Sequence, residues 1–576
     1  MNNMGKRLRV PWSPPDAAVE WAVDVVERSG VVELLSPWVD EGAGRNSTVT
    51  LSSFLDICII NSTRDYHVSH VKQFAQTAVG LSESQRRMLG IGNLTSTSAY
   101  DRIWRRWCRL YAALAREVVP GLDFEQFGNL LTLSSCAGRL RSHSAALDGT
   151  SKETWAILHN GPVLAIEDLD ADEAQMRALA ENDEGLPRAS RQPTVYAIDA
   201  NGRRQLTLDE DARGGRISAT NAEPSRLRTG FEFHYITAIK DVVWSGDVSR
   251  IAFRNITQPY VIGFTVTPMG THRADAVRDR LLWVAGEAGI CDLTTDRGYF
   301  QLSPETFYYP LVNANFSIES KLHPYQQGIR PFSGSAIIFN NSLYHEDAPI
   351  AEGFNLPFAP RGADKATMLR FEAPFNALAR WRYVLVSRDS NGTTWWKCPF
   401  CAGLLKSRQF PRSMRNGASA ELVDVASTRT TCCDGLLRAS AQDLRFHMNP
   451  PPGTTAWRMS IGRQNQAENA NSMMKSNFIR MDKKHMRVLG TPKSILLGAF
   501  DLCGYNFDRQ QCEDHQQSRS AATPQEGTFA ALLSPEQLAV GAAVAPVTAV
   551  ARAEARRGRP NSRPVRSNGA EEPGAA

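Results

Sequence analysis

The sequence predicts an α/β core that follows a helical N-terminal region and is interrupted by an inserted, mostly β region. Three observations lead to this prediction. Apolar residues recur at helical spacing through residues 17–121. Further along, two strand-like runs are followed by a helical segment and another strand, the order of a β-α-β unit. Finally, 171 residues separate Asp296 from Glu468, more than a helix and a turn require.

Length and composition set the broad class. At 576 residues the chain is too long for one hydrophobic core, so several units are expected. Its 42% hydrophobic and 22% charged residues are ordinary for a globular protein. No run of eighteen apolar residues and no apolar secretion signal is present, so we expect a cytoplasmic protein without membrane partners. Ten cysteines in this length do not indicate a disulfide framework.

The net charge of only +5 does not identify a nucleic-acid-binding protein. Evidence for such a role must come from where the basic residues lie. Residues 1–16 form a basic, proline-containing arm, and residues 17–136 form a helical region. Its segment Thr95–Val119 combines an apolar stripe with a row of arginines. The row fits either a DNA-contacting helix or a bundle helix with a solvated face. The candidate DNA-binding arginines are Arg102, Arg105, Arg106 and Arg109.

The first part of the core spans residues 137–320. We expect a strand–turn–strand around Gly149, a loop over Leu206–Gly215, and an acidic solvated segment over residues 166–187. The strands Phe231–Ala238 and Tyr260–Thr267 follow, then the helix Arg273–Gly289 and the strand Ile290–Thr295.

Two aspartates stand at strand ends in this region. Asp148 follows an apolar run and precedes Gly149-Thr150, and Asp296 follows the strand Ile290–Thr295. Because the carboxyl ends of parallel strands meet at one edge of a sheet, the two carboxylates are expected to lie together.

The second part of the core spans residues 449–510 and contains a candidate catalytic helix. Glu468, Asn471, Ser472 and Lys475 have the spacing i, i+3, i+4 and i+7, so they share one helical face. A carboxylate suits a hard divalent cation and an ammonium suits a phosphate. One glutamate does not make a magnesium site, so Asp148 and Asp296 are its expected partners.

These residues together resemble the DDE transposases of bacterial insertion sequences. The motifs are Asp148-Gly-Thr, Asp296-Arg-Gly-Tyr, and Glu468 with six residues before Lys475. The closest resemblance is to the group whose glutamate helix carries a Tyr-Arg-Glu-Lys signature. This chain departs from it, because Gln464 and Ile461 occupy the arginine and tyrosine positions, and Arg463 lies five residues before the glutamate.

The resemblance implies a ribonuclease H-like mixed sheet with flanking helices, two Mg²⁺ or Mn²⁺ ions per site, and cut-and-paste chemistry. It implies that Asp148, Asp296 and Glu468 hold the metals and that Lys475 holds a phosphate. The partners would be the terminal inverted repeats and target DNA, bound by a homodimer in a synaptic complex at the nucleoid. Arg297 and Arg463 become candidate DNA contacts, with a structural ion pair as the alternative for Arg297.

Residues 321–448 are the expected insertion. A hairpin is predicted over Ser335–Tyr344, with Asn340-Asn341 near its turn. Cys398-Pro-Phe-Cys401 has zinc-knuckle spacing, and the adjacent Cys432-Cys433 would complete one structural Zn²⁺ site of a zinc-ribbon-like region. His447 is a substitute ligand, and four reduced thiols are the alternative.

The chain ends in basic segments. Lys483 and Lys484 belong to a run that could contact phosphate. Residues 511–576 are expected to be a disordered basic tail. Within it, Arg557 and Arg559 lie in an Arg-Gly-Arg-Pro sequence, which is the core of minor-groove-binding AT-hooks or part of a generic basic tail. Two other functions stay open: a transposase-derived DNA-binding protein without catalysis, and a metal nuclease of the same fold.

Overall fold

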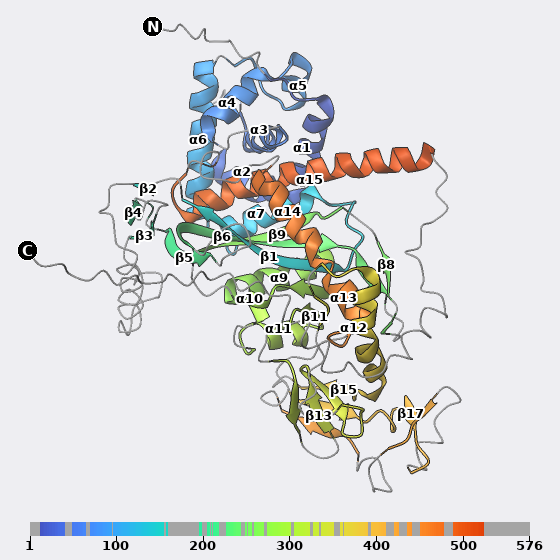
Figure 1. Cartoon of the computed structure of the whole chain (residues 1–576). Coiled ribbons are helices and arrows are strands. Elements are labelled where there is room, and N and C mark those ends of the chain that lie inside the picture. The colour runs from blue at the N-terminus through green and yellow to red at the C-terminus, as the bar shows by residue number, and fades with distance from the viewer. Residues whose placement is uncertain are drawn as a thin grey trace, which may run out of the picture.

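The computed structural model (Figure 1) gives the arrangement of most of the chain. The described residues are 12–40, 49–64, 70–94, 96–154, 157–158, 195–198, 204–207, 209, 211–217, 226–243, 248–249, 251–255, 258–269, 274–300, 304–322, 326–332, 336–350, 358–360, 362–389, 393–409, 420–425, 435–440, 450–476, 486 and 488–522.

A mixed sheet lies at the centre of the molecule. Its order is β11-β10-β1-β6, and β6 also pairs with β9 and β5. Strands β1, β10 and β11 are parallel, β6 runs against β1, and β9 runs against β6. The strands are β1 (Ser144–Glu153), β5 (Arg213–Ile217), β6 (Arg226–Ile239), β9 (Val261–Pro268), β10 (Asp292–Thr295) and β11 (Ser317–Ser320).

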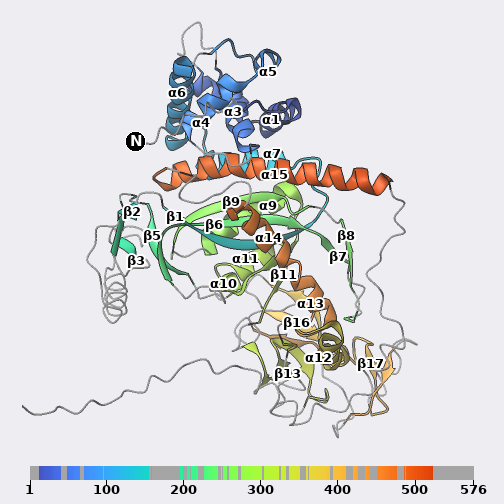
Figure 2. The same cartoon turned by 45° about the horizontal axis from the view of Figure 1, so that its top comes forward.

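Helices cover both faces of this sheet (Figures 1 and 2). Phe233 and Tyr235 of β6 share a buried cluster with apolar residues of one set of helices, whereas Leu147 and Ile236 pack with the other set. The alternation follows from the two-residue period of a strand. The first set is α7 (Phe124–Ser135), α14 (Gln464–Ser476) and α15 (Thr491–Ala522); the second is α9 (Ala274–Ala288) and α11 (Tyr308–Asn313).

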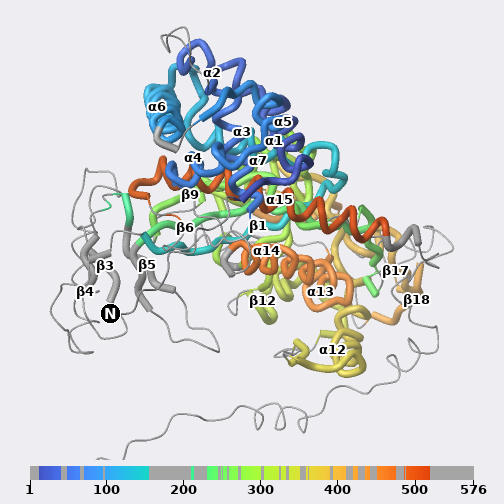
Figure 3. The backbone as a smooth tube through the Cα atoms, turned by 90° about the horizontal axis from the view of Figure 1, so that it is seen from above, coloured from blue at the N-terminus to red at the C-terminus, as the bar shows by residue number. Residues whose placement is uncertain are grey.

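The N-terminal helices stack on α15, on the side away from the sheet (Figure 2), and Figure 3 shows this stack from above. Their apolar side chains belong to the same buried cluster as those of α15. The contact with α3 is close: a Cβ on Gly504 would lie 2.2 Å from the carbonyl oxygen of Ser62, so only glycine fits. These helices are α1 (Asp16–Ser29), α2 (Val31–Val39), α3 (Leu51–Ser62), α4 (Val71–Gly80), α5 (Glu83–Met88) and α6 (Ser96–Ala115).

Between β11 and the last helices lies a region of small sheets, at the opposite end of the molecule from the N-terminal helices (Figure 1). Its predicted hairpin is confirmed, with Asn340 and Asn341 at φ 46° and 61°, as a two-residue type I′ turn requires. The elements are β12 (Ile329–Pro331), β13 (Ala336–Phe339), β14 (Ser342–His345), α12 (Lys365–Leu378), the 3₁₀ turn Ala379–Trp381, β15 (Val384–Arg388), β16 (Thr394–Lys397), β17 (Leu405–Lys406), β18 (Glu421–Leu422), β19 (Leu437–Ala439) and α13 (Thr455–Ile461).

Two more small sheets flank the central one. The first is a three-stranded sheet in the order β2-β4-β3, and the second is the pair β7-β8. Their strands are β2 (Ile157–Leu158), β3 (Val195–Ile198), β4 (Arg204–Thr207), β7 (Asp241–Val243) and β8 (Ala252–Arg254). The acidic segment 166–187 lies outside the described residues. None of the helices in the described ranges is both long and apolar enough to cross a membrane.

Several predicted elements are confirmed, namely the strands β6, β9 and β10 and the helix α9. Three predictions are wrong. No turn occurs at Gly149, because β1 runs through it and pairs with β6 over its whole length. The segment Leu206–Gly215 is not one loop, since β4 ends in it and β5 begins in it. The expected tail does not begin at residue 511, because α15 continues to Ala522.

Polar contacts hold this last part of α15 in place. The hydroxyl of Tyr260 donates a 2.6 Å hydrogen bond to Glu513, and Arg139 forms a 2.7 Å ion pair with Asp514. The residues beyond Ala522, with Arg557 and Arg559, lie outside the described part.

Candidate active site

The two predicted aspartates lie on adjacent parallel strands, Asp148 within β1 and Asp296 directly after β10. Strand β1 pairs with β10 so that Leu147 stands opposite Thr295. Asp148 is the next residue of β1 and Asp296 is the first residue after β10, so they come side by side where β10 ends. The prediction that the two aspartates lie together agrees with this register. The placement of Asp148 at the end of its strand is wrong, because β1 continues to Glu153.

Helix α14 packs over this edge and carries Glu468. The helix begins at Gln464, whose side-chain amide donates a 3.2 Å hydrogen bond to the carbonyl oxygen of Leu147. Ala467, Ala470 and Met474 are buried on its inner side, whereas Glu468 is exposed. Asn471 adds a direct bond to the first aspartate, from its Nδ2 to Oδ2 of Asp148 over 2.6 Å.

The charges of the three carboxylates are coupled. Burial, with a smaller contribution from the negative charges of Asp296 and Glu468, raises the pKa of Asp148 to about 6. Hydrogen bonds from the Gly149 amide and from Asn471 act in the opposite direction. Asp296 and Glu468 therefore lie close enough to Asp148 for their charges to act on it. They are not closed around an ion, because the described residues contain no group of three acidic, histidine or cysteine side chains placed to hold a metal.

The donor atoms around Asp148 are oxygens, the ligands preferred by Mg²⁺ and Mn²⁺. Besides the carboxylates, two buried oxygens here have no hydrogen-bond partner in the described part of the chain: Oδ1 of Asn471 and Oγ1 of Thr150. A cation next to these buried oxygens and carboxylates would satisfy groups that otherwise lack a partner. The donor types present thus suit a hard divalent metal, although the described side chains are not placed as a metal-binding group.

A buried polar relay supports the segment that carries Asp296. Tyr299 belongs to the short helix α10 (Arg297–Phe300), and its hydroxyl lies 2.7 Å from Nδ1 of His234. The other ring nitrogen of His234 lies 2.9 Å from the hydroxyl of Thr267. A Cβ on Gly149 would meet the Tyr299 hydroxyl at 2.8 Å, so the glycine makes space for the relay. Sequence reasoning missed His234, since its place in a β-rich run gives no catalytic signal.

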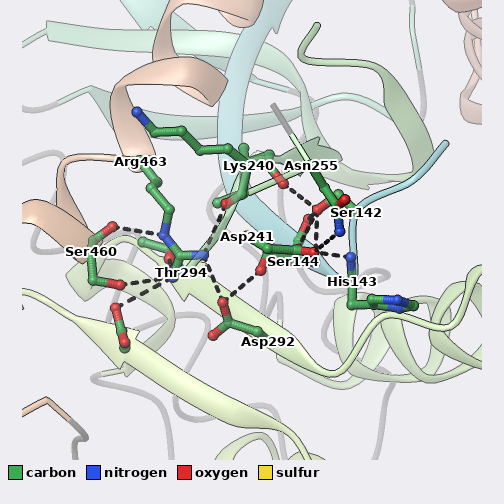
Figure 4. Close-up of polar contacts among 12 residues, drawn as sticks. Ser142, His143, Ser144, Lys240, Asp241, Asn255, Asp292, Thr294, Ser460 and Arg463 are labelled. Carbon is green, nitrogen blue, oxygen red and sulfur yellow. Dashed lines mark hydrogen bonds and ion pairs between the residues drawn. The ribbon is translucent and has the colours of Figure 1, made fainter. Parts of the chain in front are cut away.

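The other residues proposed around the site have different outcomes. The backbone of Lys475 lies on α14 and that of Arg297 begins α10, but their side chains lie outside the described residues. Lys483 and Lys484 lie outside them entirely. The assignment of Arg463 as a DNA contact is wrong, because this side chain is fully buried and bonded to Asp292 (Figure 4).

The arginine row on α6 is divided by the fold. Arg105 is exposed, Arg102 is half-buried, and Arg109 is half-buried with a 3.3 Å bond to the carbonyl oxygen of Val39. The assignment of Arg106 as a DNA contact is wrong. Its side chain is only 4% exposed and donates to the carbonyls of Val39 and Val49 at 2.6 and 2.7 Å.

Arg106 also pairs with a carboxylate of the helical region, Asp40, at 2.5 Å. It therefore closes the helical bundle instead of facing solvent, and only part of the predicted basic row is open to a ligand.

The cysteine motif folds as a tight turn. Cys398 is buried, and its sulfur accepts a 3.3 Å hydrogen bond from the Cys401 amide. An amide directed at the first sulfur would stabilise a thiolate there, as a metal ligand requires. Cys432, Cys433 and His447 lie outside the described residues, so the zinc site stays a prediction.

No protein-family model matches the sequence, and a search of curated proteins finds no match to it.

Proposed function

We propose that the chain is a DDE-type DNA transposase that cleaves the ends of a mobile element and joins them to target DNA. One observation carries this proposal: Asp148 on β1 lies beside Asp296, which follows the neighbouring parallel strand β10, and the charge of Glu468 on α14 acts on Asp148. Three parallel strands, a reversed β6 and helices on both faces further support a ribonuclease H-like core.

The three carboxylates would hold two divalent metal ions in this proposal. Bound Mg²⁺ would supply Lewis-acid stabilisation of the phosphodiester oxygens and an activated nucleophile. The chain's own residues hold the first carboxylate in place: Asn471 fixes one oxygen of Asp148, and the Gly149 amide donates to the other at 3.0 Å. Lys475 would hold a phosphate of the DNA from the same helix.

DNA binding is proposed to involve the exposed part of α6. The acidic site repels a phosphate backbone until metal binds, so cationic groups elsewhere must supply the attraction. Arg105 is exposed and Arg102 and Arg109 are half-buried there. The basic segment with Lys483 and Lys484, and the tail with Arg557 and Arg559, are further proposed contacts. A homodimer would bring two element ends together.

The test is a cleavage and strand-transfer assay with the DNA that flanks the gene as the substrate. The full chain is incubated with Mg²⁺, Mn²⁺ or EDTA, and the products are resolved on denaturing gels. We expect metal-dependent nicking at the ends of inverted repeats, followed by joining to a second DNA. The variant E468Q should bind the same DNA and leave it intact.

The alternatives give different products in the same assay. A DNA-binding descendant of a transposase would retard the repeat DNA and would neither cut nor join it. A metal nuclease of the same fold would cut without joining, with a preference for branched DNA. Either outcome would replace the transposase proposal.

A further inference from the structure

Arg463 lies at the break between two helices. Helix α13 ends at Ile461, Gly462 follows, and α14 begins at Gln464. The side chain of Arg463 is fully buried and points toward the sheet (Figure 4). Because burying an unpaired charge is costly, such a guanidinium has to be paired and hydrogen-bonded.

Every N–H group of this guanidinium has an acceptor. An arginine side chain carries five N–H groups, on Nε, Nη1 and Nη2. The acceptors are the Ser460 carbonyl at 3.0 Å, the Lys240 carbonyl at 3.2 Å, Asp292 Oδ2 at 2.7 Å, Thr294 Oγ1 at 3.3 Å and Ser460 Oγ at 2.8 Å. No donor is left over for a phosphate.

These acceptors belong to the strands that carry the candidate site. Asp292 and Thr294 lie on β10, and the buried carboxylate of Glu319 on β11 stands 3.5 Å from Nη2. The oxygen of Asp292 that binds Arg463 also accepts a 2.7 Å bond from the hydroxyl of Ser144, the first residue of β1. One carboxylate thus joins the two parallel strands to the start of α14.

We propose that Arg463 is a positioning residue, which fixes α14 and hence Glu468 relative to Asp148 and Asp296. This inference rests on the proposed function of these three carboxylates. Asp292 lies four residues before Asp296 on β10, about 13 Å along the strand. Arg463 lies five residues before Glu468, about 7.5 Å along the helix. The ion pair joins β10 to the start of α14. Asp296 and Glu468 lie further along these two elements.

This arrangement explains why the arginine lies five residues before Glu468 and not four. An arginine four residues before the glutamate would lie within the continuous part of α14, where Gln464 instead bonds the backbone of β1. Position 463 precedes α14, and from there the side chain reaches Asp292 and Thr294 on β10 and Glu319 on β11. Arg463 therefore joins the start of α14 to β10 and does not contact DNA.

The experiment measures Mn²⁺ binding to the full chain without DNA, by electron paramagnetic resonance. The variant R463M keeps the apolar stem and removes the charge and the fork. We expect it to lower Mn²⁺ affinity about tenfold or more, the range typical of residues that orient metal ligands. D292N, which keeps the size of the partner, should give a smaller loss in the same direction, and R463K should recover part of the affinity.

The matched control is R106M. Arg106 is also a buried arginine that is bonded to backbone carbonyls and one aspartate, but it lies in the N-terminal helices. Its loss should destabilise the protein and leave Mn²⁺ affinity unchanged. Equal affinity in R463M and the unmodified protein would overturn the proposal. An equal loss in R106M would also overturn it, because the effect would then be one of stability alone.

Hydrogen exchange separates this inference from the proposed function. In R463M, amides of residues 464–476 should exchange faster, while those of α6 should not; R106M should give the reverse. If the unmodified protein binds no Mn²⁺, the transposase proposal fails, and the exchange pattern alone decides whether Arg463 anchors α14. Unchanged protection of α14 in both R463M and D292N would refute the anchor.

Discussion

The side-chain amide of Asn471 donates a 2.6 Å hydrogen bond to one carboxylate oxygen of Asp148. Asn471 stands three positions after Glu468, so the same helical face presents a carboxylate to the site and holds the carboxylate of another element. The bond favours the ionised form of Asp148 and opposes the effects of burial and of the neighbouring acids.

Replacing Asn471 with leucine should therefore raise the pKa of Asp148 above its value of about 6. The ionised carboxylate is needed to bind a metal, so the acidic limb of the pH–rate profile for DNA cleavage should move to higher pH. Cleavage rates at saturating Mg²⁺, measured from acidic to mildly alkaline pH, report this shift. N469L, the same substitution at an exposed position of the same helix, is the control. An acidic limb at the same pH in N471L would show that the hydrogen bond does not govern this titration.

Replacing Asp148 with asparagine should stabilise the metal-free protein. The pKa of Asp148 is raised from 3.8 to about 6 in the folded state, so ionising this group costs folding free energy. The cost is absent below about pH 4, grows as the pH rises, and is complete above about pH 6. In EDTA at about pH 8, D148N should melt a few degrees above the unmodified protein, and at about pH 4 the difference should vanish.

Mg²⁺ should reverse this order by stabilising only the protein with three carboxylates. Differential scanning calorimetry with and without Mg²⁺ tests both statements. If D148N melts below the unmodified protein in EDTA at alkaline pH, burial and the neighbouring acids do not make ionisation of Asp148 costly as inferred.

Arg105 and Arg106 provide a matched pair for testing DNA binding. Arg105 is exposed on α6, so R105A should weaken binding to the element ends. The log–log salt slope should fall by about one unit for each phosphate that the variant no longer neutralises. Arg106 is buried with Asp40, so R106A should cost about 3–5 kcal/mol of stability instead. Fluorescence anisotropy at several salt concentrations, with urea melts, separates the two effects. An unchanged salt slope in R105A would place the DNA on another surface.

The sequence predicted best those elements whose signal is local. The alternating runs of β6 and β9, the helix α9 and the Asn340-Asn341 turn each have a pattern within a few residues. The parallel pairing of β1 with β10 then brings Asp148 and Asp296 together. The turn expected at Gly149 was wrong because glycine usually indicates a turn, whereas here it leaves space for the hydroxyl of Tyr299. That contact joins residues far apart in the chain.

The end of α15 and the burial of two arginines were harder to predict, because both depend on contacts between residues far apart in the chain. The first half of α15 is buried between two layers and shows consecutive buried residues in place of an amphipathic stripe; its polar second half resembles a tail in composition. Arg106 and Arg463 look like solvated cations until their partners, Asp40 and Asp292, are placed beside them by the fold. Local composition does not contain that information.

Zinc content tests the region of small sheets. The turn at Cys398 already directs the Cys401 amide at the first sulfur, a geometry that stabilises a thiolate. If Cys432 and Cys433 complete the site, the purified protein should contain about one zinc ion per chain. C398S should lose the zinc and lower the melting temperature, since the binding energy of a structural zinc contributes to folding.

The control for the zinc experiment is C291S, because Cys291 is an exposed thiol before β10, outside this region. It should retain both the zinc and the melting temperature. Elemental analysis of protein purified without added metal gives the content directly, and calorimetry after treatment with a zinc chelator gives the contribution to stability. Protein that contains no zinc, and whose melting temperature a chelator does not change, would mean that the four cysteines are ordinary reduced thiols. The turn at Cys398 would then be held by its backbone hydrogen bonds and by the packing of Phe400 against His345 and Trp381.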